Sequence, residues 1–130
     1  MDNCKDAVRS SIIPLLLGDS LSTHRLSAKI YLKTGIVSYV CDENKTLADH
    51  ISPFSKFFPL FSKNDDEILR GTLDYIASNK EYLPIIIPCS ERYTDFVNAN
   101  LAFLEPRFII STPEAFFQNN VIRYLVCAKG

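Results

Sequence analysis

Short, continuous apolar runs alternate with helical patterns along this chain, and this alternation constrains its fold more than any other feature. The runs are residues 11–17 (SIIPLLL), 36–41 (IVSYVC), 82–88 (YLPIIIP) and 107–111 (RFIIS). Runs this short and uninterrupted are typical of strands that are buried on both faces. Strands of that kind, separated by helices, predict a mostly parallel sheet between two helical layers.

Capping residues and glycines mark where the intervening helices begin and end. Gly35 stands where a left-handed C-terminal cap belongs, and Asn64 followed by Glu67 forms a capping-box pattern. Ser90 can cap a further helix, whose apolar stripe continues to Leu104. The helices are therefore expected to begin near residue 22, at 64, at 90 and at Thr112-Pro113.

The segment from 44 to 63 breaks this regularity. Its stretch SPFSKFFPLFS places prolines among phenylalanines, so one short strand is expected, around Phe57 to Leu60. We predict an α/β chain with a three-layer α/β/α Rossmann-like domain, built on a mostly parallel sheet of about five strands. This domain spans residues 11–119, between an N-terminal extension (1–10) and a segment (120–130) expected to be the start of a linker or a truncated tail.

Composition excludes several classes of function. Fourteen Lys and Arg residues against fifteen Asp and Glu leave a net charge of -1, so no overall field draws the chain to nucleic acid or to an anionic membrane. The first eleven residues are polar and of mixed charge, so we expect no signal peptide there, and no run approaches the roughly 18 apolar residues of a membrane span. The cysteines, at positions 4, 41, 89 and 127, form no Cys-x-x-Cys pair. We expect free thiols, no metal site and a soluble, cytoplasmic protein.

Loops that leave the carboxyl ends of parallel strands are where such sheets bind ligands. Here those loops are residues 18–20, 41–43, 61–63, 88–91 and 111–112. The first loop, Gly18-Asp19-Ser20, allows two interpretations. Either Ser20 carries chemistry, or Asp19 and Ser20 are the turn and cap of a strand-to-helix junction.

The first interpretation is a hydrolase with Ser20 as its nucleophile, because Gly-Asp-Ser-Leu after a first strand is similar to the signature of GDSL-type esterases. Such an enzyme needs a base that takes the serine proton, and that family supplies it from an Asp-x-x-His motif near the C-terminus. Neither His24 nor His50 follows an Asp by three residues, and His24 lies one turn along the same helix. We therefore expect a cap at Ser20.

The second interpretation rests on three stretches: IIPLLLGDSLSTHRLSAKIYLKTGIVSYV, LPIIIPCSERYTDFVNAN and FIISTPEAFFQN. In these, from Ile12 to about Asn119, the chain resembles the N-terminal, pre-ATP-grasp domain of ATP-grasp carboxylate-amine ligases. The similar branch includes D-aspartate ligase-like proteins. The stretches correspond to that family's opening strand with its Gly-Asp turn and helix, its Pro-Cys turn with a tyrosine-bearing helix, and its last strand.

The resemblance implies an ATP-dependent ligase, in which a carboxylate is activated as an acyl phosphate and attacked by an amine, with Mg²⁺ at the phosphates. That family binds ATP and metal in ATP-grasp domains, which need on the order of 100 to 250 further residues and are the expected partner in cis. For this chain alone it implies no catalysis and no cofactor. It implies substrate contacts in the edge loops, at Gly18, Asp19, Ser20, His24, Cys89, Ser90 and Glu91.

A third alternative is a stand-alone protein-interaction module. The phenylalanines at 54, 57, 58 and 61 cannot all point to one face of a strand, because neighbouring side chains alternate. Some of them, together with Tyr124, Leu125 and Val126, are therefore expected at the surface. Exposed apolar surface of this kind would favour self-association into a homo-oligomer.

Overall fold

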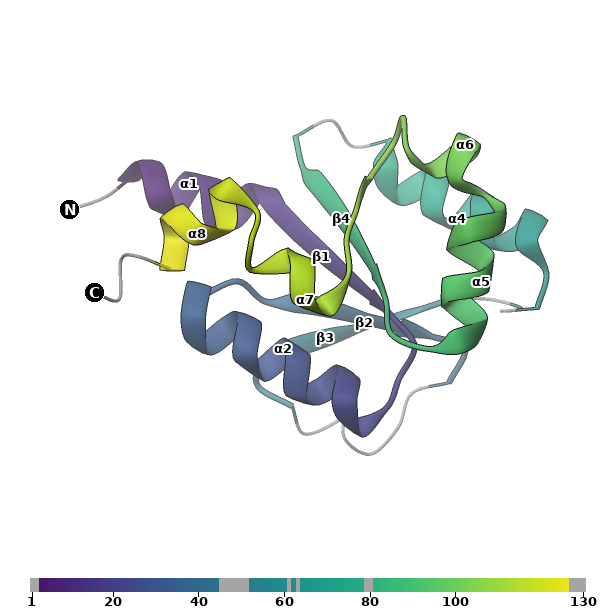
Figure 1. Ribbon diagram of the computed structural model, residues 1–130, viewed down its shortest axis with the longest axis horizontal. Helices are drawn as coiled ribbons and strands as arrows, with labels where there is room; N and C mark the ends of the chain where they lie inside the picture. Colours follow the sequence, from purple (N-terminus) through teal and green to yellow (C-terminus); the bar gives the residue numbers. More distant parts are fainter. Residues whose placement is uncertain (1–2, 45–51, 61, 63, 79–80, 127–130) are drawn as a thin grey trace.

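A five-stranded sheet, parallel throughout, forms the centre of the protein (Figure 1). The computed structural model describes residues 3–44, 52–60, 62, 64–78 and 81–126. The strands stand in the order β3-β2-β1-β4-β5, with bounds β1 Ile12–Leu17, β2 Ser38–Asp42, β3 Ser55–Pro59, β4 Leu83–Pro88 and β5 Ile109–Ile110. The predicted α/β class and the parallel pairing of the four apolar runs are confirmed.

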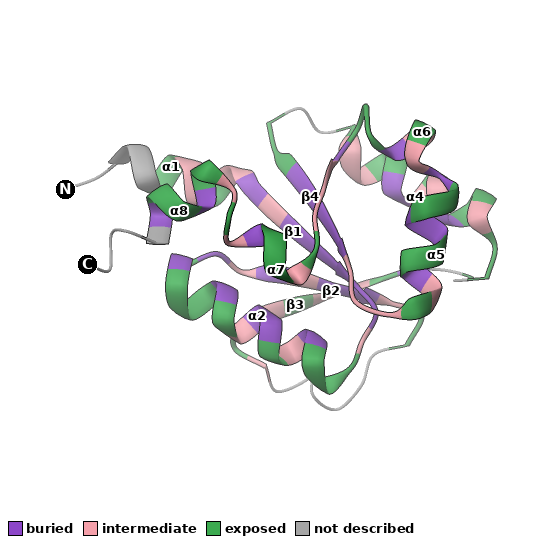
Figure 2. Ribbon diagram, in the orientation of Figure 1, coloured by how far each residue is buried: buried purple, intermediate pink, exposed green. Residues whose placement is uncertain are grey.

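Helices cover both faces of this sheet and bury its side chains in two layers (Figure 2). Leu16 of β1 points into the layer formed with α2 (Leu21–Thr34), α7 (Pro113–Phe116) and α8 (Asn120–Val126). Its neighbour Leu15 points into the layer formed with α4 (Asp66–Ala77), α5 (Glu91–Ala99) and α6 (Leu101–Leu104). Both leucines are at most 1% exposed, which explains why the strands are apolar at successive positions.

Most helix ends follow the sequence signals, with two corrections. Gly35 ends α2 in the left-handed conformation, and the side chains of Ser90 and Thr112 cap α5 and α7 as predicted. Helix α4 is capped by Asp65 rather than Asn64, because the Asp65 carboxylate accepts from the N–H groups of Glu67 and Ile68. The single helix expected over 90–104 is broken at Asn100 into α5 and α6.

The two ends of the described chain pack beside each other on the amino-terminal edge of the sheet (Figure 1). The predicted extension contains α1 (Asn3–Ser11), whose Arg9 donates from Nε to the carbonyl of Thr34 at the end of α2, at 2.7 Å. In α8, Leu125 is fully buried, so its predicted exposure is wrong, whereas Tyr124 is exposed. Phe61 and the side chain of Val126 lie outside the described part. None of the described helices has the length and apolar character that crossing a membrane requires.

Candidate functional site at the carboxyl edge of the sheet

The chain changes direction across the sheet between β1 and β4. From β1 it proceeds outward through β2 to β3, and it then returns to place β4 and β5 on the other side of β1. The loops after β1 and β4 therefore diverge toward opposite faces, which creates the switch point where open α/β sheets bind ligands. The residues predicted as substrate contacts lie in these loops or, for His24, one turn into α2.

Gly18 brings the two loops into direct contact. Its φ of +115° suits glycine, and a Cβ added there would lie 3.2 Å from both Cβ and Oγ of Ser90. Its N–H donates to the carbonyl of Cys41 at 2.8 Å, and the N–H of Cys89 donates to the carbonyl of Leu17 at 2.7 Å. The ends of β1, β2 and β4 are thus fastened to one another by their backbones.

Asp19 and His24 form a nearly buried pair at the start of α2. Oδ1 of Asp19 lies 2.9 Å from Nε2 of His24, and the two side chains are 3% and 12% exposed, respectively. Such shielding from water strengthens the interaction between the two groups and makes the loss of either partner costly. The pair fixes the direction of the imidazole ring relative to the turn.

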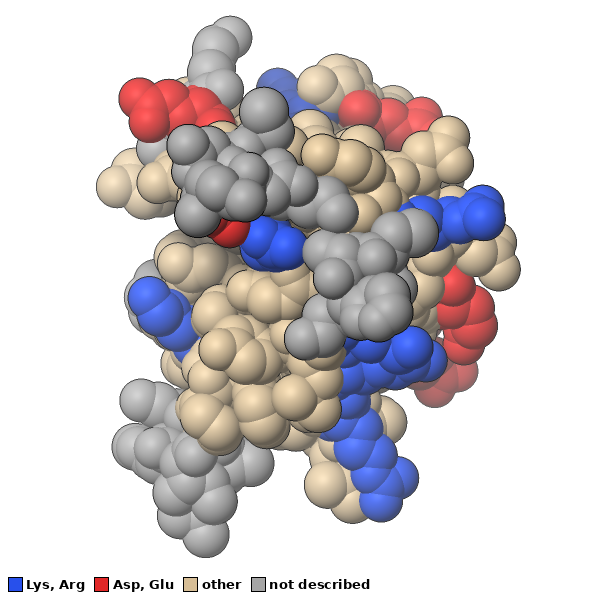
Figure 3. All heavy atoms as spheres, turned by 90° about the vertical axis from the view of Figure 1, so that its left-hand side faces the viewer, with Lys and Arg blue, Asp and Glu red and all other residues tan. Residues whose placement is uncertain are grey.

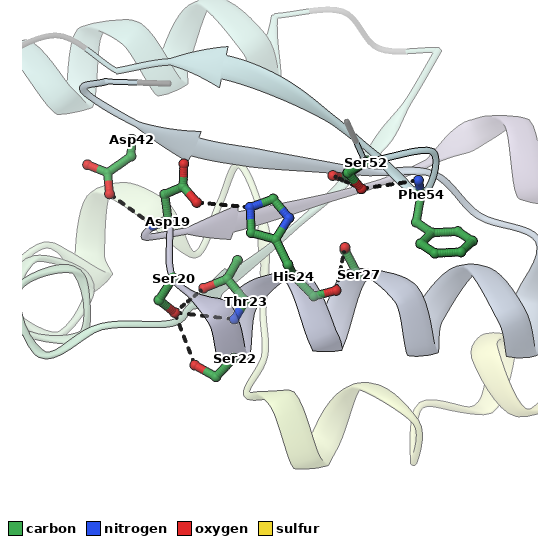
Figure 4. Close-up of polar contacts among 10 residues, drawn as sticks. Asp19, Ser20, Ser22, Thr23, His24, Ser27, Asp42, Ser52 and Phe54 are labelled. Carbon is green, nitrogen blue, oxygen red and sulfur yellow. Dashed lines mark hydrogen bonds and ion pairs between the residues drawn. The ribbon is translucent and has the colours of Figure 1, made fainter. Parts of the chain in front are cut away.

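Ser20 is the N-cap of α2, as predicted. Its hydroxyl accepts from the N–H of Thr23 at 3.3 Å and lies 3.0 Å from the hydroxyls of both Ser22 and Thr23. Figure 4 shows the Ser20 side chain directed toward these groups, while the ring of His24 is directed toward Asp19. This geometry gives Ser20 the contacts of a cap and engages His24 elsewhere; His50, the other candidate base, lies outside the described residues.

Asp42 is the central acceptor of this edge and was not among the predicted site residues. Its Oδ2 accepts from the N–H of Asp19 at 2.9 Å, while Oδ1 accepts from the N–H of Glu43 at 2.8 Å and from the hydroxyl of Tyr93 at 3.0 Å. One carboxylate thereby ties the end of β2 to the first turn and to α5. Burial, together with the adjacent carboxylate, holds the pKa of Tyr93 well above its usual range, so the phenol keeps the proton it donates.

Two free cysteines, Cys41 and Cys89, lie at this edge, and burial disfavours the ionised form of both thiols. Burial raises the pKa of Cys41 far above its usual range, with Cys89 and Asp42 adding to the effect. Burial also raises the pKa of Cys89 to about 11, against the opposing effect of a hydrogen bond with Thr23. A thiol must ionise to act as a nucleophile, so the raised pKa values oppose nucleophilic reactivity at both positions. Glu91 stands exposed at the first position of α5.

Several backbone donors at this edge are already engaged, and carboxylates lie beside them. A phosphate-binding turn presents convergent N–H groups at a helix N-terminus, but here the N–H groups of Gly18, Asp19 and Cys89 already donate within the protein. The carboxylates of Asp19 and Asp42 would also repel an anion. Among the described residues, no group of three or more His, Cys, Asp or Glu side chains is placed to hold a metal ion.

Comparisons with protein-family models, with curated proteins and with solved structures each found no match to this chain. The functional assignment therefore depends on the sequence stretches and on the geometry of the edge described above.

Proposed function

We propose that this chain is the substrate-side, pre-ATP-grasp domain of an ATP-dependent carboxylate-amine ligase, and that it has no catalytic activity by itself. The observation that carries the proposal is the switch point between β1 and β4, where the Gly-Asp turn of the resemblance meets the Pro-Cys-Ser turn at Gly18 and Ser90. Two of the three stretches that suggested the family meet there. The free thiols at this edge favour the cytoplasm as the compartment.

The chemistry of the edge favours a substrate over a nucleotide. Its exposed and partly exposed acids are Asp42, Glu43 and Glu91, and the N–H groups of Asp19 and Glu43 already donate to the Asp42 carboxylate. Carboxylates and hydroxyls of this kind can accept hydrogen bonds from the ammonium group of an amine substrate. ATP and Mg²⁺ would be held by the ATP-grasp domain in cis, where the family keeps its phosphate ligands.

The proposal can be tested by nuclear magnetic resonance on the ¹⁵N-labelled chain. The chain is titrated separately with each of the common amino acids, with small dicarboxylates and with Mg-ATP. We expect at least one amino acid, through its ammonium group, to shift the amide signals of residues 18–24, 42–43 and 89–93, and Mg-ATP to leave them in place. The proposal would be contradicted if Mg-ATP shifted the signals of this edge, or if none of the ligands did.

The coding sequence downstream of codon 130 provides an independent test. An in-frame continuation into an ATP-grasp domain supports the proposal, and the longer protein should then release ADP only when both a carboxylate and an amine are present. A stop codon directly after Gly130 would favour the stand-alone interaction module instead.

A further inference from the structure

A groove between α4 and the sheet lies at the amino-terminal edge, opposite the switch point. It encloses about 300 Å³, and the side chains that line it are mostly aromatic or branched, including Ile13, Tyr39, Phe58, Tyr75, Ile76 and Tyr82. The strand residues among them share one face, since Tyr39 pairs with Leu15 on one side and with Lys56 on the other. This groove has the size and the lining of a small-molecule site.

A second cavity of about 380 Å³ continues this groove past the ends of the strands. It shares Ile13, Tyr39 and Tyr82 with the first cavity, and its lining adds the basic residues Arg9 and Lys56. Together the two cavities form what we call the tyrosine groove, aromatic at one end and basic at the other. Figure 3 views this edge of the molecule, where separate Lys and Arg side chains, together with some Asp and Glu, lie among a largely uncharged surface.

The aromatic end leaves rings in contact with water. Tyr75 is 78% exposed and Tyr82 is 41% exposed, and both line the cavity. Tyr39 and Phe58 at the base are only partly buried. A cluster of exposed aromatic rings beside a cavity is a surface that a ligand or partner can bury.

The charges at the basic end favour an anion. Arg9 is engaged, with Nη1 donating to Oδ1 of Asp6 at 2.8 Å. Lys56 is exposed on the edge strand β3, and within the described part of the chain it makes no ion pair. Two acids adjoin the aromatic end in sequence: Asp74, which is held by Arg107 at 2.8 Å, and Glu81, which is exposed. Among the described residues that line the groove, Lys56 is thus the cation that makes no ion pair.

We propose that the tyrosine groove binds a small amphipathic carboxylate, with an aromatic or aliphatic body against Tyr39, Tyr75 and Tyr82 and its carboxylate at Lys56. Charge complementarity favours a carboxylate over a neutral ligand. A neutral ligand would bury the tyrosine rings but would make no ion pair with Lys56. The groove lies at the opposite edge of the sheet from the switch point, so this site is separate from the proposed substrate contacts.

The test uses 4-phenylbutyrate as the probe and 4-phenyl-1-butanol as its neutral counterpart, with amide shifts of the ¹⁵N-labelled chain as the readout. We expect 4-phenylbutyrate to shift the signals of Ile13, Tyr39, Phe58 and Tyr75, with a dissociation constant of roughly 1 mM, ordinary for a ligand of this size. The alcohol should bind more weakly at the same residues.

Matched variants separate the two ends of the groove. Lys56→Gln should weaken the carboxylate about two- to five-fold, as loss of an exposed ion pair does, and should leave the alcohol unchanged; Lys29→Gln, on α2, is the control. Tyr75→Ser should weaken both probes, and Tyr124→Ser on α8 neither. The proposal would be overturned by shifts confined to other surfaces or by equal binding of both probes. It would also be overturned if the groove signals shifted with protein concentration in the absence of ligand, which would indicate that a second copy of the chain binds there.

Discussion

The hydroxyl of Tyr93 donates to Oδ1 of Asp42 at 3.0 Å, joining residues that stand 51 positions apart in the sequence. The same carboxylate receives the N–H of Asp19, so the turn after β1 is positioned by a residue of β2 and, through it, by α5. The geometry of the candidate site is therefore a property of three elements rather than of the Gly-Asp-Ser turn alone.

This link should be measurable as stability. Tyr93→Phe removes one hydrogen bond at a nearly buried position and should lower the free energy of unfolding by about 1–2 kcal/mol. Asp42→Ala should cost more, because it leaves two further N–H donors without their acceptor. Urea unfolding measures both, and Tyr75→Phe at an exposed ring is the control, expected within about 0.5 kcal/mol of wild type. Additive effects of Asp42→Ala and Tyr93→Phe would show that the two groups do not interact.

Gly18 gives a second prediction about the same turn. Gly18→Ala forces a side chain into a φ of +115° and toward Ser90 at 3.2 Å, so it should destabilise the chain by about 1–3 kcal/mol. Gly71→Ala is the matched control, because Gly71 lies within α4 with open space around it. That change should stabilise by about 0.5–1 kcal/mol. Equal effects of the two substitutions would contradict the strained turn.

The sequence predicts the strands of this fold better than the contacts between them. A strand buried on both faces is recognisable as a continuous apolar run in the sequence, which is why the runs ending in Leu17 and Pro88 predict strands correctly. The Asp42–Tyr93 bond depends on β2 standing next to β1, and apolar runs carry no information about strand order. Tyr93 also fits the apolar stripe of its helix, since its ring is 1% exposed, and only its hydroxyl reveals the second role.

The local sequence pattern likewise does not predict helix ends that depend on tertiary contacts. Asn100 lies within an apolar stripe that reads as one helix, yet its Nδ2 donates to the carbonyl of Phe96 at 2.8 Å and to Oδ2 of Asp66 at 3.1 Å. Its Oδ1 accepts from Arg70 at 2.6 Å. These bonds to α4 stabilise the break between α5 and α6, and a side chain that competes with the backbone in this way ends helices.

The same network predicts a dependence of stability on pH. Two hydrogen bonds, a larger contribution from Arg92 and a smaller one from Asn100, hold the pKa of Asp66 below its ordinary value of 3.8. Because the folded-state pKa is depressed, this contribution is present above 3.8 and is lost as the pH falls through the folded-state pKa.

Unfolding of wild type and Asp66→Asn from pH 7 to pH 2 checks this expectation. The difference in stability between them should be constant near neutrality and should shrink in acid. Since Arg92 and Asp66 are 30% and 36% exposed, we expect no more than about 1 kcal/mol. Asp74→Asn, which removes a pair at a more exposed site, is the control. A difference that grows in acid would contradict the role of Asp66.

Ser20 should behave as a cap and not as a nucleophile. The isolated chain should neither hydrolyse p-nitrophenyl esters nor react with a fluorophosphonate probe. The Ser20 hydroxyl contacts Ser22 and Thr23, while the imidazole of His24 is engaged by Asp19. Ser20→Ala should instead lower the free energy of unfolding by about 0.5–2 kcal/mol. Labelling of Ser20 that is abolished by His24→Ala or by His50→Ala would restore the esterase interpretation.

The last prediction is that this chain alone has no measurable affinity for ATP and that Mg²⁺ does not change its melting temperature. The N–H groups of Gly18 and Asp19 are engaged by the carbonyl of Cys41 and by the carboxylate of Asp42. These two donors are therefore not available to a phosphate, and the carboxylates of Asp19 and Asp42 would repel it. The N-terminus of one helix contributes only about 0.3–1 kcal/mol to an anion, too little against the several kcal/mol that association costs. Calorimetric titration with Mg-ATP measures this directly, and Asp42→Asn tests the cause, since removing one negative charge should still not create a site while the backbone donors stay occupied. A dissociation constant in the micromolar range or below, for wild type, would show that the chain holds a nucleotide by itself.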